Sequence, residues 1–155
     1  MKSREVARSS VAAVVLNDFI HGKRPQDIAL AKTMNGSSLF FTGGMWHTVP
    51  GMWEWFDLSD LVAAIAPRAV LGSEGGTAAA LPRVERAFEF AGAPDAFEYH
   101  HFPEFDTPEE RPFDDEPMPE GLLINDYYTR AHTNPKEHYF KGHLAVPWLC
   151  EKFGL

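Results

Sequence analysis

The sequence predicts an α/β fold, with a sheet of about three parallel strands flanked by helices. Three observations support this prediction. Residues 11–17 and 69–71 are short apolar runs of the kind found in strands covered on both faces. Segments with helical periodicity lie between and after these runs, so strands and helices alternate along the chain. Polar or glycine-rich residues follow the strand candidates, at the position where open parallel sheets place their ligand chemistry.

Composition and charge narrow the classes of function. The 155 residues fit a single domain, 1–155, and a hydrophobic content of 45% is enough for a sizeable core. The net charge of −8 argues against binding nucleic acid or an anionic membrane, because both need a basic face. One cysteine excludes an internal disulfide and a Cys-rich zinc site. The sequence shows neither an apolar stretch of membrane-spanning length nor a signal-peptide core. We therefore expect a cytoplasmic protein, with secretion of a longer parent left open.

The first strand candidate, residues 11–17, is β-branched and apolar over nearly its whole length, which suits a parallel strand covered on both faces. Ten mostly polar residues precede it, and they offer no earlier strand to pair with it. An unpaired strand edge is a template for pairing with another chain. We therefore predict self-association through this edge of an incomplete sheet.

An aromatic-rich segment follows at residues 39–56, interrupted by Gly-Gly and Pro-Gly. Such a segment could line a pocket for a sugar ring or an aromatic acyl group, with Trp46, His47 and Trp53 as candidate substrate-binding residues. The alternative is that these rings pack a loop onto the sheet, because aromatic side chains dominate ordinary cores. The sequence leaves both interpretations open.

Residues 56–76 predict a short helix, a Pro-Arg corner, a buried strand at 69–71 and a glycine turn. Ser59 is the expected N-cap of the helix. Glu74 lies in the glycine turn, where a carboxylate can either face a ligand or simply accept hydrogen bonds from backbone N–H groups. One face of the helix should be buried, with Leu61, Ala64 and Ile65 on it.

The remaining segments continue the alternation. Residues 79–91 have an amphipathic helical pattern that ends at Gly92, and residues 96–102 predict the last strand. Residues 103–120 differ from both, with five prolines and eight acids against one arginine. This composition predicts a solvated loop insertion. The apolar tail at 144–153 predicts a final helix packed on the sheet.

The stretch at 57–71, Asp-Leu-Ser-Asp-Leu-Val-Ala-Ala-Ile-Ala-Pro-Arg-Ala-Val-Leu, follows Val-Pro-Gly-Met at 49–52. It resembles the late part of α/β-hydrolases of the acetyl xylan esterase and dienelactone hydrolase type. The resemblance extends roughly from Val11 to Phe153 and implies a partial α/β-hydrolase sheet, the C-terminal half of the fold. It also implies a carboxylic-ester hydrolase, acetyl esterase-like and extending to carbohydrate esters, that acts on a small-molecule ester without a cofactor.

The resemblance further implies where the acid and the base lie. Chain order in this fold is serine, acid, histidine. Glu74 follows the 69–71 strand, and His138 precedes the last helix and is followed by an aromatic pair, as in the family. Two departures stand out: Ala78 occupies the family's aspartate position, so Glu74 would substitute from one turn earlier, and the acidic segment intervenes before His138. The sequence contains no Gly-x-Ser-x-Gly, so we expect the chain alone to lack a nucleophile and to be inactive.

Two other interpretations stay open. A metal-dependent hydrolase could use the histidines, but none of them has the helical spacing of a metal motif, and neighbours on a strand point to opposite faces. We therefore predict no metal site. The chain could instead be a non-catalytic or degenerate hydrolase fragment that acts as an interaction module. The histidines weighed for a metal or a catalytic role are His100, His101, His132, His138 and His143.

Overall fold

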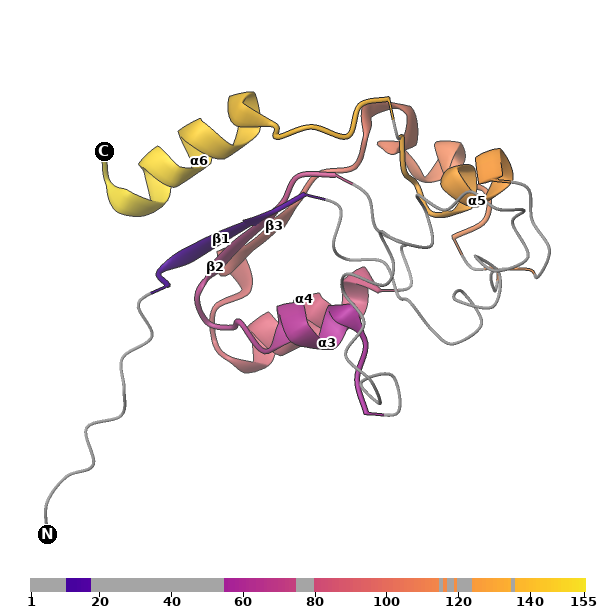
Figure 1. Cartoon of the computed structure of the whole chain (residues 1–155). Coiled ribbons are helices and arrows are strands. Elements are labelled where there is room, and N and C mark those ends of the chain that lie inside the picture. The colour runs from indigo at the N-terminus through magenta and orange to yellow at the C-terminus, as the bar shows by residue number, and fades with distance from the viewer. Residues whose placement is uncertain are drawn as a thin grey trace, which may run out of the picture.

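Among the residues that the structure describes, three parallel strands form one sheet. The computed structural model describes residues 11–17, 55–74, 80–114, 116, 119, 124–134 and 136–155. Within this part of the chain, the strand order is β1-β2-β3, and both neighbouring pairs are parallel (Figure 1). The strands are β1 (Ala13–Leu16), β2 (Ala69–Gly72) and β3 (Phe97–Tyr99). The predicted α/β fold with three parallel strands is confirmed.

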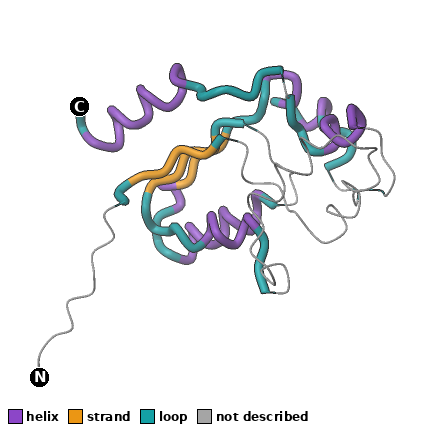
Figure 2. Tube along the Cα trace, viewed as in Figure 1, coloured by secondary structure: helices purple, strands orange, loops and turns teal. Residues whose placement is uncertain are grey.

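Helices cover both faces of the sheet (Figure 2), which explains why β1 and β2 carry no charged or polar side chain. α3 (Leu58–Ala63) and α4 (Leu81–Phe90) lie against one face, and α6 (Gly142–Phe153) lies against the other. Side chains alternate along β2, so Val70 packs with α3 and α4 whereas Leu71 packs with α6. Both are fully buried, and burial of each such side chain stabilises the fold by roughly 1.5–3 kcal/mol.

β1 forms one edge of the sheet. Among the described residues it pairs with β2 alone, from Ala13 opposite Ala69 to Leu16 opposite Gly72. Alternate β1 side chains face the two helical layers, as expected for a strand covered on both faces. All four residues of β1 are half-buried, however, whereas β2 is almost entirely buried. The edge position accounts for this difference.

The start of α3 differs from the sequence prediction. Asp57, not Ser59, is the N-cap: its side chain accepts from the Leu58 N–H at 2.7 Å. Asp60 completes a capping box by accepting from the Asp57 N–H at 2.8 Å, so two backbone donors are satisfied reciprocally. The buried residues of α3 are Leu58, Ser59 and Val62, because packing against the core selects this face. Two residues predicted to be buried are instead exposed, namely Leu61 and Ala64.

α4 follows the predicted pattern. Pro82 lies in its first turn, where the missing N–H is not needed. Val84 and Phe88 are fully buried against the sheet. Gly92, with φ of +72°, follows the last turn in the left-handed conformation that glycine adopts without strain. β3 is shorter than the predicted strand at 96–102.

The acidic segment is more ordered than a solvated loop. It contains two short 3₁₀ turns, η3 (Pro103–Phe105) and η4 (Pro108–Glu110), and Phe105 is buried. Arg111, its one arginine, donates to the carbonyl oxygens of Phe105 and Asp106 and to the carboxylate of Asp114. The composition identified the charge imbalance but not this organisation around a single cation.

Beyond the acidic segment, α5 (Ile124–Arg130) leads by a loop to α6. Arg130 at the end of α5 lies 3.0 Å from the Glu116 carboxylate and stacks over the Phe113 ring. α6 begins two residues earlier than predicted and buries Ala145 and Trp148. In the part of the chain that the structure describes, the helices are too short or too polar to cross a membrane.

Candidate functional site

The candidate site lies at the carboxyl ends of β1 and β2, where Asn17 follows one strand and Ser73 and Glu74 follow the other. The Ser73 N–H donates to the Leu16 carbonyl oxygen at 2.9 Å. The Ser73 hydroxyl lies 3.0 Å from the same oxygen and donates to Asn17 Oδ1 at 2.6 Å. These bonds lock the two strand ends together and place Glu74 at the rim of the sheet, as the topology of parallel sheets predicts.

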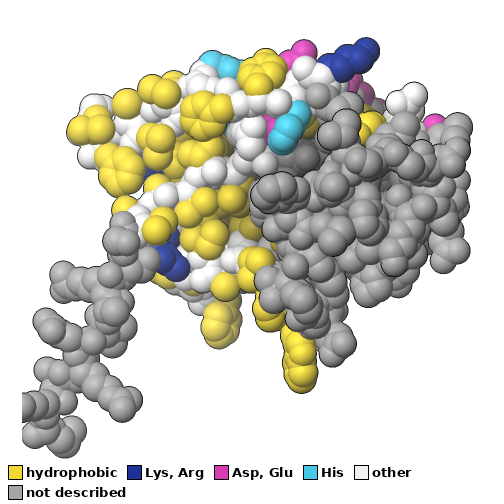
Figure 3. All heavy atoms as spheres, in the orientation of Figure 1, with side chains coloured by type: hydrophobic (Ala, Val, Ile, Leu, Met, Phe, Trp, Pro, Cys, Tyr) yellow, Lys and Arg dark blue, Asp and Glu magenta, His cyan; other side chains and the backbone are white. Residues whose placement is uncertain are grey.

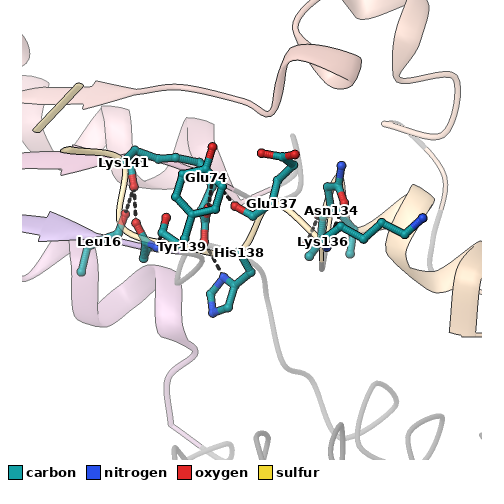
Figure 4. Close-up of polar contacts among 12 residues, drawn as sticks. Leu16, Glu74, Asn134, Lys136, Glu137, His138, Tyr139 and Lys141 are labelled. Atoms are coloured by element: carbon teal, nitrogen blue, oxygen red, sulfur yellow. Dashed lines mark hydrogen bonds and ion pairs between the residues drawn. The ribbon is translucent and has the colours of Figure 1, made fainter. Parts of the chain in front are cut away.

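Glu74 is a buried carboxylate, with 1% of its surface exposed. A buried charge is unfavourable unless partners compensate for the lost water. Its Oε1 is hydrogen-bonded to His138 Nδ1, and its Oε2 lies 3.0 Å from Lys141 Nζ (Figure 4). Both partners come from the loop before α6, so this loop and the end of β2 together form the site.

Asn17 fixes the position of that loop. Its amide Nδ2 donates to the Tyr139 carbonyl oxygen at 2.8 Å, while its Oδ1 accepts from Ser73. One side chain thus joins the end of β1, the end of β2 and the backbone beside His138. The contact spans 122 positions in sequence.

His138 is the exposed member of the site, with 53% of its side chain open to solvent. An ionised carboxylate only accepts hydrogen bonds, so the His138 Nδ1 that contacts Glu74 carries the proton. In the neutral ring, Nε2 is then an acceptor on the opposite edge. This arrangement can hold an imidazole in one tautomer and present its other nitrogen as a base.

Lys141 is buried on the other side of the carboxylate. Besides contacting Glu74, its ammonium group donates to the Glu137 carbonyl oxygen. It also lies 3.5 Å from the centroid of the Tyr139 ring and 5.2 Å from that of Phe102, within the range of cation–π attraction.

The structure therefore brings together the acid and the base proposed from the sequence, although 64 positions separate Glu74 from His138. Their catalytic role stays a prediction. The candidate substrate-binding residues Trp46, His47 and Trp53 lie outside the described residues, as does Ala78.

The other histidines have different surroundings. His132 is buried and its Nε2 lies 3.0 Å from Asp114 Oδ1, while His100 pairs with the exposed carboxylate of Glu98. Burial, with the nearby Arg111 charge as the next largest cause, lowers the pKa of His101 to about 4. Within the described ranges, we find no group of three His, Cys, Asp or Glu residues placed to hold a metal ion.

Three residues of the site were missed from the sequence, namely Asn17, Ser73 and Lys141. The first two carried a usable signal, because each is the polar residue that directly follows a parallel strand. Lys141 carried none, since its position before a helix gives no indication of a carboxylate contributed by β2.

Known proteins resemble this chain in sequence and in structure. The model of a family described as the Abhydrolase family matches residues 5–151. A crystal structure from Bacteroides fragilis NCTC 9343, of a protein provisionally assigned as an acetyl xylan esterase, matches with a TM-score of 0.78 and 30% identity. The match covers 94% of this chain and 37% of that protein, so the chain spans about a third of its length. Among curated proteins, none matches this chain.

Proposed function

The chain belongs to the Abhydrolase family, and on that basis we propose that it carries the acid and the base of an ester-hydrolase site. The resemblance to acetyl xylan esterase-like α/β-hydrolases is confirmed, and an esterase-like hydrolase is the function class that it supports. In the proposed site, Glu74 is the acid that orients the imidazole and His138 is the general base.

The observation that carries this proposal is the hydrogen bond between Glu74 and His138 Nδ1. In a Ser-His-acid mechanism the acid holds the Nδ1–H, and Nε2 takes the proton of the attacking hydroxyl and returns it to the leaving group. The buried carboxylate and the half-exposed ring fit these two roles. A base must be reachable by substrate, whereas its orienting acid works better away from water.

The proposed mechanism also needs a nucleophile, and this sequence contains no Gly-x-Ser-x-Gly elbow to supply one. We propose that a serine hydroxyl from another polypeptide segment meets His138 Nε2. The limited coverage of the similar protein, 37% of its length, supports this proposal. The substrate proposed is a small-molecule ester, with acetyl esters of carbohydrates as the class suggested by that protein's provisional assignment.

Hydrolysis of p-nitrophenyl acetate tests the proposal. We expect the chain alone to show no turnover, and a fusion to a segment bearing a Gly-x-Ser-x-Gly elbow from a related hydrolase to show it. In the fusion, His138→Ala and Glu74→Gln should each reduce turnover strongly, while His143→Ala, at an exposed position of α6, should not. Turnover by the chain alone that His138→Ala abolishes would contradict the missing nucleophile. Turnover by the fusion that survives both substitutions would contradict the site.

A second candidate function is that of an interaction module, and the β1 edge favours it. Among the described residues, β1 has one strand neighbour. Exposed apolar side chains include Val11, two residues before β1, and Val146 and Phe153 on α6. Figure 3 shows hydrophobic side chains gathered over this side of the molecule. Unpaired edges and exposed apolar patches are common sites of association. We propose self-association through this surface.

Native mass spectrometry over a range of protein concentrations tests the second function. We expect dimers or larger species whose proportion rises with concentration, and a lower proportion in Val146→Glu, which places a charge on the surface without disturbing the core. A strict monomer at every concentration would contradict self-association.

A further inference from the structure

We propose that Lys141 is a positioning residue, which holds the Glu74 carboxylate so that Oε1 stays directed at His138 Nδ1. A role for Lys141 in catalysis rests on the proposed function. Its effect on the orientation of Glu74 and on the His138 tautomer can be tested without any enzymatic activity.

Lys141 occupies a position that is unfavourable for a cation in two respects. It has 6% of its surface exposed, and lysine is rarely buried unless it is paired. It is also the N-cap residue of the 12-residue helix α6, and it makes no side-chain cap hydrogen bond there. The N-terminal end of a helix carries partial positive charge, which disfavours a second positive charge. A lysine in this position needs a specific compensating partner.

The contacts of the ammonium group identify that partner. Lys141 Nζ lies 3.0 Å from Glu74 Oε2 and donates to the Glu137 carbonyl oxygen. The Tyr139 and Phe102 rings lie at 3.5 and 5.2 Å. Because groups surround it on several sides, the ammonium is a fixed point charge and not a flexible surface cation.

The two oxygens of Glu74 have different partners. Oε2 contacts Lys141, and Oε1 contacts His138 Nδ1. Rotation of the carboxylate would break both contacts, so each partner restrains the other. Without Lys141, the carboxylate has one restraint fewer, and the Nδ1–H tautomer of His138 loses part of its preference. Lys141 therefore acts on His138 through Glu74.

A purely structural role would also explain a buried ion pair, since Lys141 neutralises Glu74 in either case. The two roles differ in their effect on the imidazole. If Lys141 only compensates for the buried charge, removing it changes stability but leaves the tautomer of His138 as it was. If Lys141 positions the carboxylate, removing it changes the tautomer as well.

The ¹⁵N chemical shifts of the His138 ring report which nitrogen carries the proton. In the intact chain we expect the Nδ1–H tautomer. In Lys141→Met we expect the ratio of Nδ1–H to Nε2–H to fall roughly tenfold, the size expected when a charge-assisted hydrogen bond is weakened. Lys141→Arg, which keeps the charge, should retain most of the ratio. The control is Lys136→Met, which removes an exposed positive charge from the same loop and should change nothing.

An unchanged tautomer ratio in folded Lys141→Met would overturn the inference. If that variant does not fold, the tautomer ratio is measured in the double variant Lys141→Met/Glu74→Gln, which leaves no unpaired buried charge. It is compared with the ratio in Glu74→Gln alone. Equal ratios in the two support action through Glu74, and a further change in the double variant contradicts it. A wild-type His138 that carries its proton on Nε2 would contradict both this inference and the proposed function. An inactive fusion with the expected tautomers would contradict the proposed function alone.

Discussion

Among the described residues, two clusters place a carboxylate between a histidine and a cation, and they differ in which member is open to solvent. The Glu74 cluster consists of Glu74, His138 and Lys141, and the Asp114 cluster consists of Asp114, His132 and Arg111. In the Glu74 cluster, the acid is fully buried and 53% of the histidine side chain is exposed. In the Asp114 cluster, 2% of the histidine side chain and 19% of the acid side chain are exposed.

The two histidines also use different nitrogens. His138 contacts its acid through Nδ1, whereas His132 contacts Asp114 through Nε2. The His132 ring is further enclosed by Phe105 and His101, with ring centroids 5.5 and 5.9 Å away.

This difference separates a candidate base from a structural contact. A general base needs a nitrogen within reach of the substrate, and in the Glu74 cluster the ring is open on the side away from the acid. In the Asp114 cluster the ring is enclosed, and the contacts join the acidic segment to the end of α5. A histidine, a carboxylate and a cation can therefore form either a catalytic site or a structural contact. The exposure of the histidine distinguishes the two.

The largest expected effect concerns activity. In the fusion that carries a nucleophile, His138→Ala should reduce turnover of p-nitrophenyl acetate by about 10²–10⁴-fold, the usual contribution of a general base. The exposed ring contributes little packing, so the expected loss of unfolding free energy is that of the hydrogen bond to buried Glu74, about 1–3 kcal/mol. His132→Asn should differ in activity, with turnover retained per folded molecule. Equal losses of turnover in the two variants would remove the distinction between the clusters.

The next effect concerns the cations. Lys141→Met leaves Glu74 charged and buried without its ion-pair partner, and removing one member of a buried pair typically costs about 3–5 kcal/mol of unfolding free energy. Arg111→Met should cost less, because its carboxylate partner Asp114 is partly exposed. Urea unfolding curves measure both. The control is Lys152→Met, which removes a longer and more exposed ion pair at 3.6 Å and should stay within about 1 kcal/mol. A larger loss in Arg111→Met than in Lys141→Met would reverse the comparison.

A smaller loss of stability is expected from His132 itself. His132 has φ of +49°, in the left-handed region that asparagine tolerates better than most residues. His132→Asn therefore removes the ring without straining the backbone. Loss of the ring contacts and of the contact with Asp114 should cost about 2–3 kcal/mol of unfolding free energy, measured by urea unfolding at neutral pH. A change within 0.5 kcal/mol, typical of surface substitutions, would show that the Asp114 cluster is not structural.

Local patterns predicted most of the fold. The strands, α4 and α6 are recognisable because their side chains must alternate between two covered faces or follow one helical face, and both requirements act on neighbours in sequence. The N-cap of α3 was misassigned because Asp57 and Ser59 are both good caps. The choice between them depends on the Asp60 side chain reaching back to the Asp57 N–H.

The site was predicted only in part, for a related reason. Glu74 could be located from its place after a strand, and His138 from its place before the last helix. Lys141 and the bond from Asn17 to Tyr139 depend on contacts between distant segments, which a single sequence does not record. The hydrogen bonds of Arg111 could not be predicted either, because the composition of residues 103–120 is typical of a solvated loop.

The last expected effect concerns pH, and it extends the comparison to His101, the third ring beside the Asp114 cluster. Burial, then the charges of Arg111 and His132, lower the pKa of His101 from 6.5 to about 4, although Asp114 and Asp106 act in the opposite direction. The ring lines an open hollow of about 370 Å³ between α4 and β3, so solvent reaches it.

The unfolded chain therefore binds more protons at His101 than the folded chain does between pH 4 and 6.5. Stability must then fall as the pH drops through this window. His101→Gln removes the titrating group, so its free energy of unfolding should decline less than that of the wild type between pH 7 and pH 4.5. Urea unfolding at the two pH values measures the difference, and His100→Gln, at the exposed neighbour, is the matched control. Parallel declines in wild type and His101→Gln would show that the ring is protonated as easily in the folded chain as in the unfolded one.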